Sequence, residues 1–131
     1  MAGPRSPLLE TFAGWLTAFG DAWEATDAHR LAALFALGAS MQPDPFAELI
    51  RGRRQIAHHW AGELEAMRDV HFAAQVLGAG DTYGVAHFRV TFAASERRAA
   101  GVRDGVLLAA LDARGLCTSL RMWWHESGAG E

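Results

Sequence analysis

The stretch YGVAHFRVTFAA, residues 83–94, decides how the rest of the chain is interpreted. Its apolar and polar residues alternate, and a period of two predicts a β-strand with one buried face. The buried face carries Ala86, Phe88, Val90 and Phe92, and the opposite face carries His87, Arg89 and Thr91. With the apolar face inward, His87 and Arg89 look outward, toward a dimer partner. A register slip of one residue would instead bring Arg89 into a pocket, as a clamp for an anion or an enolate.

Three further strands are predicted around this one. Alternation also occurs over residues 70–77 and 116–125, and a nearly all-apolar run covers 104–111. Short turns between them predict an antiparallel meander of four strands, with the Arg-rich residues 95–103 as a hairpin tip. Residues 126–131 are small or charged and are expected to fray.

The N-terminal half is predicted to be mainly helical. Apolar residues at helical spacing predict one helix over about 7–25 and another over about 53–68. Between them, Asp27 would cap a helix over 28–37, and the proline-containing residues 39–46 predict a short edge strand or a loop. Helices that precede an antiparallel sheet give an α+β fold. We expect the sheet to curl around the helices as a cone that is open at one end.

Composition excludes several classes of protein. The chain has 131 residues, 50% hydrophobic and 21% charged, which predicts one folded domain over residues 1–131. The net charge of −3 lacks the basic excess of nucleic-acid-binding modules. Cys117 is the only cysteine, so no internal disulfide and no cysteine-based zinc site can form. The histidine, aspartate and glutamate residues show no metal-ligand spacing, and there is no glycine-rich nucleotide motif, so we expect no metal and no cofactor. There is also no long apolar run, so we expect no membrane contact and a cytoplasmic location.

Four stretches together resemble a known family. They are DAHRLAALFALGASMQPDPF (27–46), RGRRQIAHHW (51–60), GDTYGVAHFRV (80–90) and DGVLLAALDARGLCTSLRMWW (104–124). In this order they look like the nuclear transport factor 2-like superfamily and, within it, the SnoaL-like group, over about residues 8–125. The resemblance implies a cone-shaped, cystatin-like α+β barrel and a homodimer packed through the outer face of the sheet. It implies no single activity, because members include ketosteroid isomerases, polyketide cyclases, dehydratases, epoxide hydrolases and non-catalytic partners.

Asp44 is the first candidate for catalysis. Pro43 and Pro45 restrict the backbone on both sides and hold one carboxylate on a stiff mount. In an aromatic pocket, loss of water would make this carboxylate a stronger base. The alternative interpretation is a turn that carries a solvated acid. The resemblance favours the first interpretation, because the Asp44-Pro45 pair is similar to the segment where ketosteroid isomerases carry their base.

The resemblance also limits the chemistry. Isomerisation through an enolate needs hydrogen-bond donors for the oxygen, and the residues that fall at those places, Phe19 and Leu107, cannot donate. The epoxide hydrolase branch needs two inward acids bridged by an arginine. The predicted inward strand faces contain none, which disfavours epoxide hydrolysis. Cyclase members use a pocket acid, and Asp104 could serve, although we expect it near a hairpin tip.

The remaining candidates are apolar or lie on the third helix. The aromatic content is unusual for so small a domain; most rings must form the core, and some should line the cavity. The residues expected to contact the substrate are Trp15, Phe19, Trp23, Phe46, Trp60, Phe88, Val90, Leu107, Leu120 and Trp124. The resemblance places Trp60 and Trp124 at the pocket. His59 and Glu63 lie one helical turn apart and could pair, as a solvated contact.

The sequence therefore predicts an enzyme without a cofactor that transfers protons on a hydrophobic, ring-bearing substrate. The reaction would be an isomerisation, a cyclisation or a dehydration. Two alternatives stay open: a module of the same fold that binds a ligand without turnover, and a dimerisation domain with a filled core.

Overall fold

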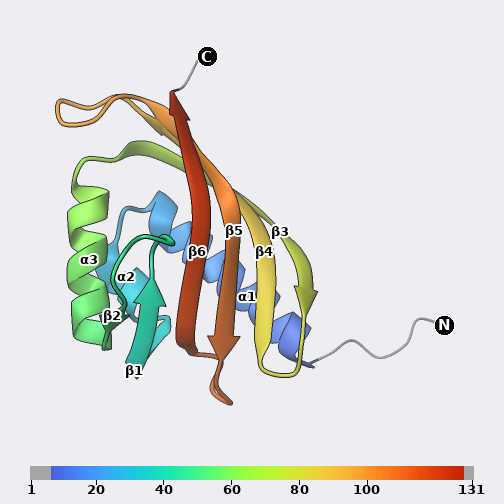
Figure 1. Ribbon diagram of the computed structural model, residues 1–131. Coiled ribbons are helices and arrows are strands. Elements are labelled where there is room, and N and C mark those ends of the chain that lie inside the picture. Colours follow the sequence, from blue (N-terminus) through green and yellow to red (C-terminus); the bar gives the residue numbers. More distant parts are fainter. Residues whose placement is uncertain (1–6, 129–131) are drawn as a thin grey trace.

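The computed structural model describes residues 7–128, with side chains from residue 9 onward, and it confirms the α+β architecture (Figure 1). Helix α1 (Pro7–Glu24) lies along the concave side of a curved sheet of six strands that does not close into a barrel. Helices α2 (Ala28–Ala32) and α3 (Arg53–Glu65) pack together beside the first strand. The predicted cone is therefore present, with one side left open.

The meander is as predicted, but three of its strands, β3, β5 and β6, are longer. The sheet order is β2-β1-β6-β5-β4-β3. Strands β3 (Arg68–Ala79), β4 (Tyr83–Ala93), β5 (Gly101–Leu111) and β6 (Cys117–Gly128) pair in antiparallel fashion. The sequence predicted that β5 begins at residue 104 and that β6 ends at residue 125. Part of the expected hairpin tip and part of the expected frayed end therefore belong to the sheet.

The region after α2 differs from the prediction. The helix expected over 28–37 has five residues, and β1 (Phe35–Gln42) follows it. Strand β1 pairs in parallel with β6 and in antiparallel with the two-residue edge strand β2 (Ile50–Arg51). Asp27 caps α2 as predicted, since its side chain accepts a hydrogen bond from the backbone N–H of Arg30 at 3.1 Å. Pairing with β6, which lies far away in the sequence, outweighs the local helical pattern of this segment.

Aromatic rings fill the concave side of the sheet. The inward face of β4 is buried, as the alternation predicted. Against it, the ring of Trp23 lies 4.9 Å from that of Trp60, and the ring of Phe19 lies 5.7 Å from that of Trp60. Gly20 lets Phe72 approach α1, because a Cβ at this glycine would lie 2.4 Å from the Phe72 ring. The centre of the cone is thus occupied by side chains.

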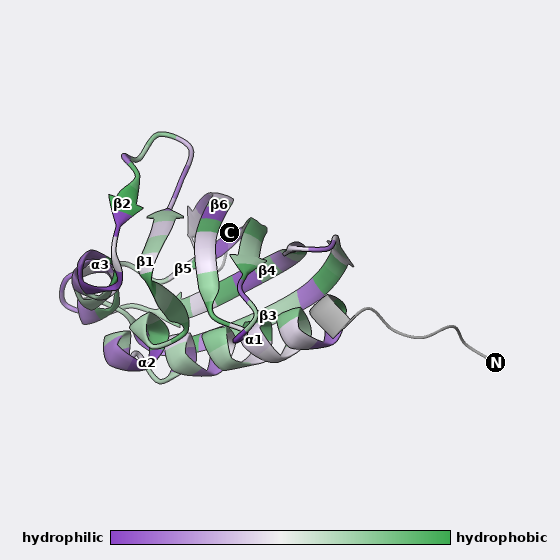
Figure 2. Cartoon of the chain, turned by 90° about the horizontal axis from the view of Figure 1, so that it is seen from below, coloured by the Kyte–Doolittle hydropathy of each residue, from purple (hydrophilic) through white to green (hydrophobic). Residues whose placement is uncertain are grey.

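The hydropathy of the residues follows the packing of α1 against the sheet (Figure 2). Helix α1 buries one stripe, which is Phe12, Trp15, Leu16, Phe19, Ala22 and Trp23. Strand β2 and the loop before it project from the rest of the domain (Figure 2). None of the helices within residues 7–128 combines the length and the apolar character needed to span a bilayer.

Candidate functional site

A groove of about 470 Å³ lies between the loop that follows β1 and the strands β5 and β6. It is lined by Asp44, Pro45, Phe46, Asp104, Gly105, Val106, Trp123, Trp124 and His125. Asp44 is half-buried, and its Oδ1 accepts a hydrogen bond from the backbone N–H of Phe46 at 2.8 Å. This bond closes a turn that orients the carboxylate. Asp44 is therefore both a turn acid and part of the groove wall.

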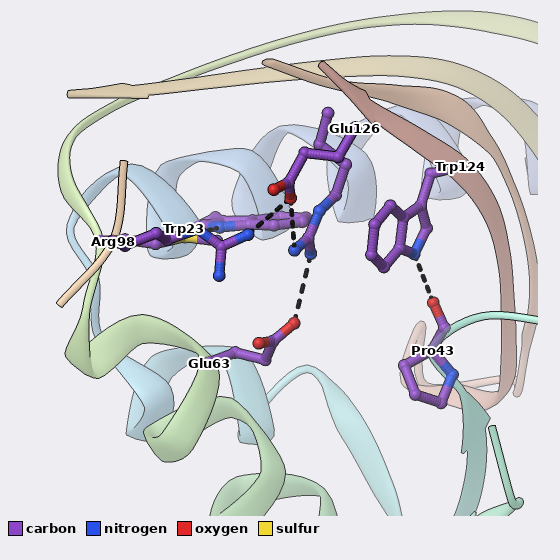
Figure 3. A network of polar contacts seen from close by, with 8 residues as sticks. Trp23, Pro43, Glu63, Arg98, Trp124 and Glu126 are labelled. Carbon is purple, nitrogen blue, oxygen red and sulfur yellow. Dashed lines mark hydrogen bonds and ion pairs between the residues drawn. The ribbon is translucent and has the colours of Figure 1, made fainter. Parts of the chain in front are cut away.

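Trp124 connects this groove to the interior of the cone. Its indole Nε1 donates a hydrogen bond to the backbone oxygen of Pro43 at 2.6 Å (Figure 3). The guanidinium carbon of Arg103 lies 3.8 Å from the centre of the Trp124 ring. Cations are attracted to the faces of such rings, so this contact stabilises Arg103 in the interior. One indole thus contacts both the loop of Asp44 and a buried charge.

Among residues 9–128, Arg103 is the charged residue that is buried, with 4% of its surface exposed. Its guanidinium bridges two carboxylates: Nη1 donates to Glu63 on α3 and Nη2 donates to Glu126 on β6, each at 3.3 Å (Figure 3). Arg98, in the hairpin tip between β4 and β5, donates to the same oxygen of Glu126. The side chains of Glu63 and Glu126 keep contact with solvent, whereas that of Arg103 does not. We call Glu63, Arg98, Arg103 and Glu126 the arginine network.

The arginine network corrects the expectation that no arginine bridges two inward acids. The prediction was wrong because Arg103 was assigned to the hairpin tip, Glu126 to the frayed end and Glu63 to a solvated helix face. Extending the alternation would have found the first two. Arg103 precedes Leu107 and Ala109 on the inward face of β5, and Glu126 follows Trp124 on the inward face of β6.

His59 lies beside this network on α3. Burial lowers the pKa of His59 from its ordinary value of 6.5, and the charge of Arg103 lowers it further. The charges of Glu63 and Asp44 act in the opposite direction, but burial dominates. The imidazole is therefore neutral at pH 7 and can either accept or donate a proton. The expected contact between His59 and Glu63 is an electrostatic one in a half-buried position.

His87 and Arg89 face outward, as the alternation predicted. His87 Nε2 and Arg89 Nε each lie 2.8 Å from a different oxygen of Asp104. The hydrogen bonds from His87 and Arg89 hold the pKa of Asp104 below its ordinary value. Asp104 lies within β5, on the outer face, and not at a hairpin tip. An acid tied to two partners on that face is not free to act as the pocket acid of a cyclase.

The structure places the predicted apolar site residues in two groups. Phe46 and Trp124 line the groove with Asp44, and Phe46 is 98% exposed. The others are buried in the core: Trp15, Phe19, Trp23, Trp60, Phe88, Val90, Leu107 and Leu120. Trp15 is tied into it by a hydrogen bond from Nε1 to the backbone oxygen of Leu34 at 3.0 Å. Ligand contact by this buried group stays a prediction.

Within residues 7–128, no group of three or more histidine, cysteine, aspartate or glutamate side chains is arranged to hold a metal ion. Cys117 is buried, and burial raises the pKa of its thiol to about 12. The thiol therefore stays protonated and unreactive at pH 7. The groups available for chemistry around the groove are carboxylates, the imidazoles of His59 and His125, and guanidinium N–H donors.

Comparisons with known proteins identify the family. A model for the SnoaL-like domain matches residues 16–115. A search of curated proteins finds no significant match. Among solved structures, the chain is similar to SalBIII, an epoxide hydrolase/cyclase-like enzyme described in pyran ring formation in the polyether salinomycin. The TM-score is 0.80, with 13% identity over 95% of this chain and 99% of that chain. Rv0760c from Mycobacterium tuberculosis matches with a TM-score of 0.76 and 13% identity over 96% and 98% of the two chains. The chain belongs to the SnoaL-like domain family of the nuclear transport factor 2-like superfamily.

Proposed function

We propose that the protein is an enzyme without a cofactor that binds a hydrophobic, ring-bearing small molecule and moves protons on it, by isomerisation, cyclisation or dehydration. The groove beside Asp44 carries this proposal, because a carboxylate lines it together with the aromatic side chains of Phe46 and Trp124. Its volume of about 470 Å³ falls within the range of small-molecule sites, roughly 300–1,000 Å³. The likeness to SalBIII, an epoxide hydrolase/cyclase-like enzyme, supports ring chemistry.

In this proposal Asp44 removes a proton from a carbon next to a carbonyl group of the substrate. The C–H bond breaks, its electron pair forms a carbon–carbon double bond, and the carbonyl π pair moves onto oxygen. Return of the proton to another carbon completes an isomerisation. His59, neutral because of its burial, is the second proton carrier. Phe46 and Trp124 hold the ring, and the buried aromatic residues behind them exclude water.

The test follows exchange of the acidic protons of 2-tetralone, a bicyclic ketone, in D₂O by proton NMR. Asp44→Asn keeps the acceptor of the turn but removes the base, so we expect exchange to slow by about 100-fold or more with binding retained. Asp112→Asn is the matched control, because Asp112 also accepts backbone N–H bonds in a turn but lies outside the groove. Exchange at the wild-type rate in Asp44→Asn would exclude Asp44 as the base. Binding of 2-tetralone by the wild type without exchange would favour the non-catalytic module.

The arginine network favours a second candidate function, the opening of an epoxide ring. Two carboxylates on either side of one guanidinium can divide the work: one accepts a proton from the attacking water, and the other, when protonated, donates to the epoxide oxygen. Glu63 and Glu126 are placed in this way around Arg103. The substrate for the test is 1,2-epoxytetralin, and the product is the diol. Glu63→Gln and Glu126→Gln should each reduce hydrolysis by at least tenfold, and equal rates in all three proteins would exclude this candidate.

We also propose a homodimer formed through the outer face of the sheet. Val85, Leu108 and Ala110 are half-buried there in the single chain. Beside them, Asp104 is paired with His87 and Arg89, and Arg121 packs over the Trp123 ring at 4.8 Å. A second copy would cover the apolar part of this face. Light scattering should report the mass of two chains for the wild type and of one chain for Leu108→Glu. Leu37→Glu, at an exposed leucine of β1, should leave the dimer intact.

A further inference from the structure

A second groove, of about 410 Å³, lies where α2, α3 and β1 meet, near the edge of the sheet formed by β1 and β2 (Figure 1). It is lined by His29, Ala32, Ala33, Leu37, Arg53, Arg54 and Ala57. It shares no lining residue with the groove beside Asp44. Four of its side chains are apolar and three are basic, and none of the described side chains in this lining is acidic. The groove therefore combines an apolar wall with positive charge.

The apolar wall includes a leucine that the core of the domain does not bury. Leu37 belongs to β1, and 78% of its surface is exposed. The pairing of β1 with β6 is interrupted at this point, where residues 36–39 of β1 lie opposite the single residue Thr118 of β6. A bulge of this kind re-aims the side chains of a strand. It leaves a large apolar side chain at the groove, where burial by the alkyl part of a ligand would be favourable.

The positive charge of this groove comes mainly from the first two residues of α3. Arg53 Nε donates a hydrogen bond to the backbone oxygen of Phe35 at 2.8 Å, which holds the guanidinium in place and leaves its two terminal NH₂ groups for another acceptor. The side chain of Arg54 makes no hydrogen bond or ion pair within residues 9–128. The dipole of a helix disfavours cations in its first turn, and this turn contains no acid. Helix stability therefore does not explain the two arginines, whereas an anion bound to them would.

The composition of the groove favours a carboxylate over a phosphate as this anion. The parallel N–H groups of a guanidinium match the two oxygens of a carboxylate. A phosphate monoester carries about −1.5 to −2 charges at pH 7, and it would lose more hydration beside the leucine and the three alanines of the wall. A carboxylate carries one charge, and Arg54, which has no other partner within residues 9–128, can balance it.

We propose that this groove is a second ligand site, which binds an aliphatic carboxylate. The carboxylate group contacts the guanidinium groups of Arg53 and Arg54, and the alkyl chain covers Leu37 and the small alanine side chains of α2 and α3. His29, on α2, can donate one further hydrogen bond from its ring. The site lies outside the aromatic interior of the cone, so the inference goes beyond the proposed function and does not depend on it.

The experiment compares the affinities of four small molecules by calorimetry at low ionic strength. Octanoate carries the carboxylate and the chain, butyrate shortens the chain, octylammonium reverses the charge, and octyl phosphate increases it. Octanoate should bind roughly tenfold more tightly than butyrate, because each added methylene that an open groove covers in part contributes about a factor of two. It should also bind more tightly than the other two molecules. Equal affinities for octanoate and butyrate, tighter binding of octylammonium or octyl phosphate, or no binding of octanoate would overturn the proposal.

Two pairs of variants separate the site from the overall charge and hydrophobicity of the chain. Arg54→Gln removes one cation and Leu37→Ser removes apolar surface, and each should weaken octanoate binding by about fivefold. Arg51→Gln and Leu49→Ser are the matched controls, because both residues are exposed and lie outside the lining of the groove. They should keep the wild-type affinity. Equal losses in a variant and its control, or wild-type affinity in Arg54→Gln, would refute the assignment.

Amide NMR locates the bound octanoate. The resonances of Ala33 and Ala57 should shift during the titration, whereas those of Gly105 and Val106, in the groove beside Asp44, should not. Asp44→Asn should keep the affinity for octanoate, even where it abolishes proton exchange on a ketone. Shifts confined to Gly105 and Val106, or an affinity that falls in Asp44→Asn, would place octanoate in the first groove and overturn the proposal of a second site.

Discussion

Arg103→Met removes the buried centre of the arginine network and should destabilise the domain by about 3 kcal/mol. The guanidinium makes two charge-assisted bonds, to Glu63 and Glu126, each at 3.3 Å. This length exceeds that of strong ion-pair bonds, so each contributes about 1 kcal/mol, toward the low end of the usual range. The contact with the Trp124 ring at 3.8 Å adds about 1 kcal/mol. Solvent reaches both glutamates, which lets them rehydrate and keeps the loss at the lower end of the 3–5 kcal/mol seen for fully buried pairs.

The assay is urea unfolding at pH 7, followed by circular dichroism, with thermal unfolding beside it. A loss of about 3 kcal/mol corresponds to a fall of roughly 10 °C in Tm for a domain of this size. Arg89→Met is the matched control, because Arg89 bonds Asp104 at the shorter distance of 2.8 Å but has 61% of its side chain exposed. Exposed pairs contribute little, so this variant should lose less than about 1 kcal/mol.

Two outcomes would refute this reasoning. Equal losses in Arg103→Met and Arg89→Met would mean that burial does not strengthen the interior pair. A gain in stability for Arg103→Met would mean that the cost of burying the guanidinium exceeds its contacts. Adding Glu63→Gln and Glu126→Gln to Arg103→Met should recover part of the loss at pH 7, because neutral glutamine side chains need no counterion.

Four other variants test three separate features. Gly20→Ala should destabilise the domain by about 2 kcal/mol, because the new Cβ would clash with the Phe72 ring. Gly14→Ala, where no atom lies within 4 Å of the new Cβ, should stabilise the domain by about 0.5–1 kcal/mol through helix propensity, and urea unfolding measures both changes. The pKa of His59 is lower in the folded than in the unfolded state, so the folded state binds fewer protons and stability falls as pH drops below about 6.5. His59→Gln should remove this part of the decline, measured as the difference in unfolding free energy between pH 7.5 and pH 5. Trp124→Phe removes the bond to the Pro43 oxygen and should cost about 1 kcal/mol, with faster amide hydrogen exchange in residues 44–47 as its specific signature.

The sheet could be predicted because its information is local. In 83–94 the alternation alone places Phe88 and Val90 inward, and short turns leave the meander as the simplest pairing. Strand β1 could not be predicted in this way, since its parallel partner β6 lies at the other end of the chain. Within the segment 28–37, residues 28–32 form the helix α2 as the local pattern predicts, whereas residues 35–37 belong to β1.

The candidate site was predicted only in part. Asp44 and Trp124 were expected together, and both line one groove. Phe46 lines the same groove, but its side chain is 98% exposed. Arg103 was missed because composition outweighed periodicity: an arginine near an Arg-rich tip was assigned to the loop. Where a charged residue continues the inward alternation of a strand, an opposite charge should be sought on the facing strand or helix.

A filled cone changes what the family fold can do with its interior. Arg103 is buried against the Trp124 ring, and in a region of low dielectric constant its ion pairs with Glu63 and Glu126 are stronger than they would be in solvent. The carboxylate of Asp44 lies outside this region, in the half-buried wall of the groove. Trp124 contacts both regions, through its ring on Arg103 and its N–H on the Pro43 oxygen, one residue before Asp44. A shift of this one indole would therefore weaken the contacts of the buried guanidinium and of the Asp44 loop together.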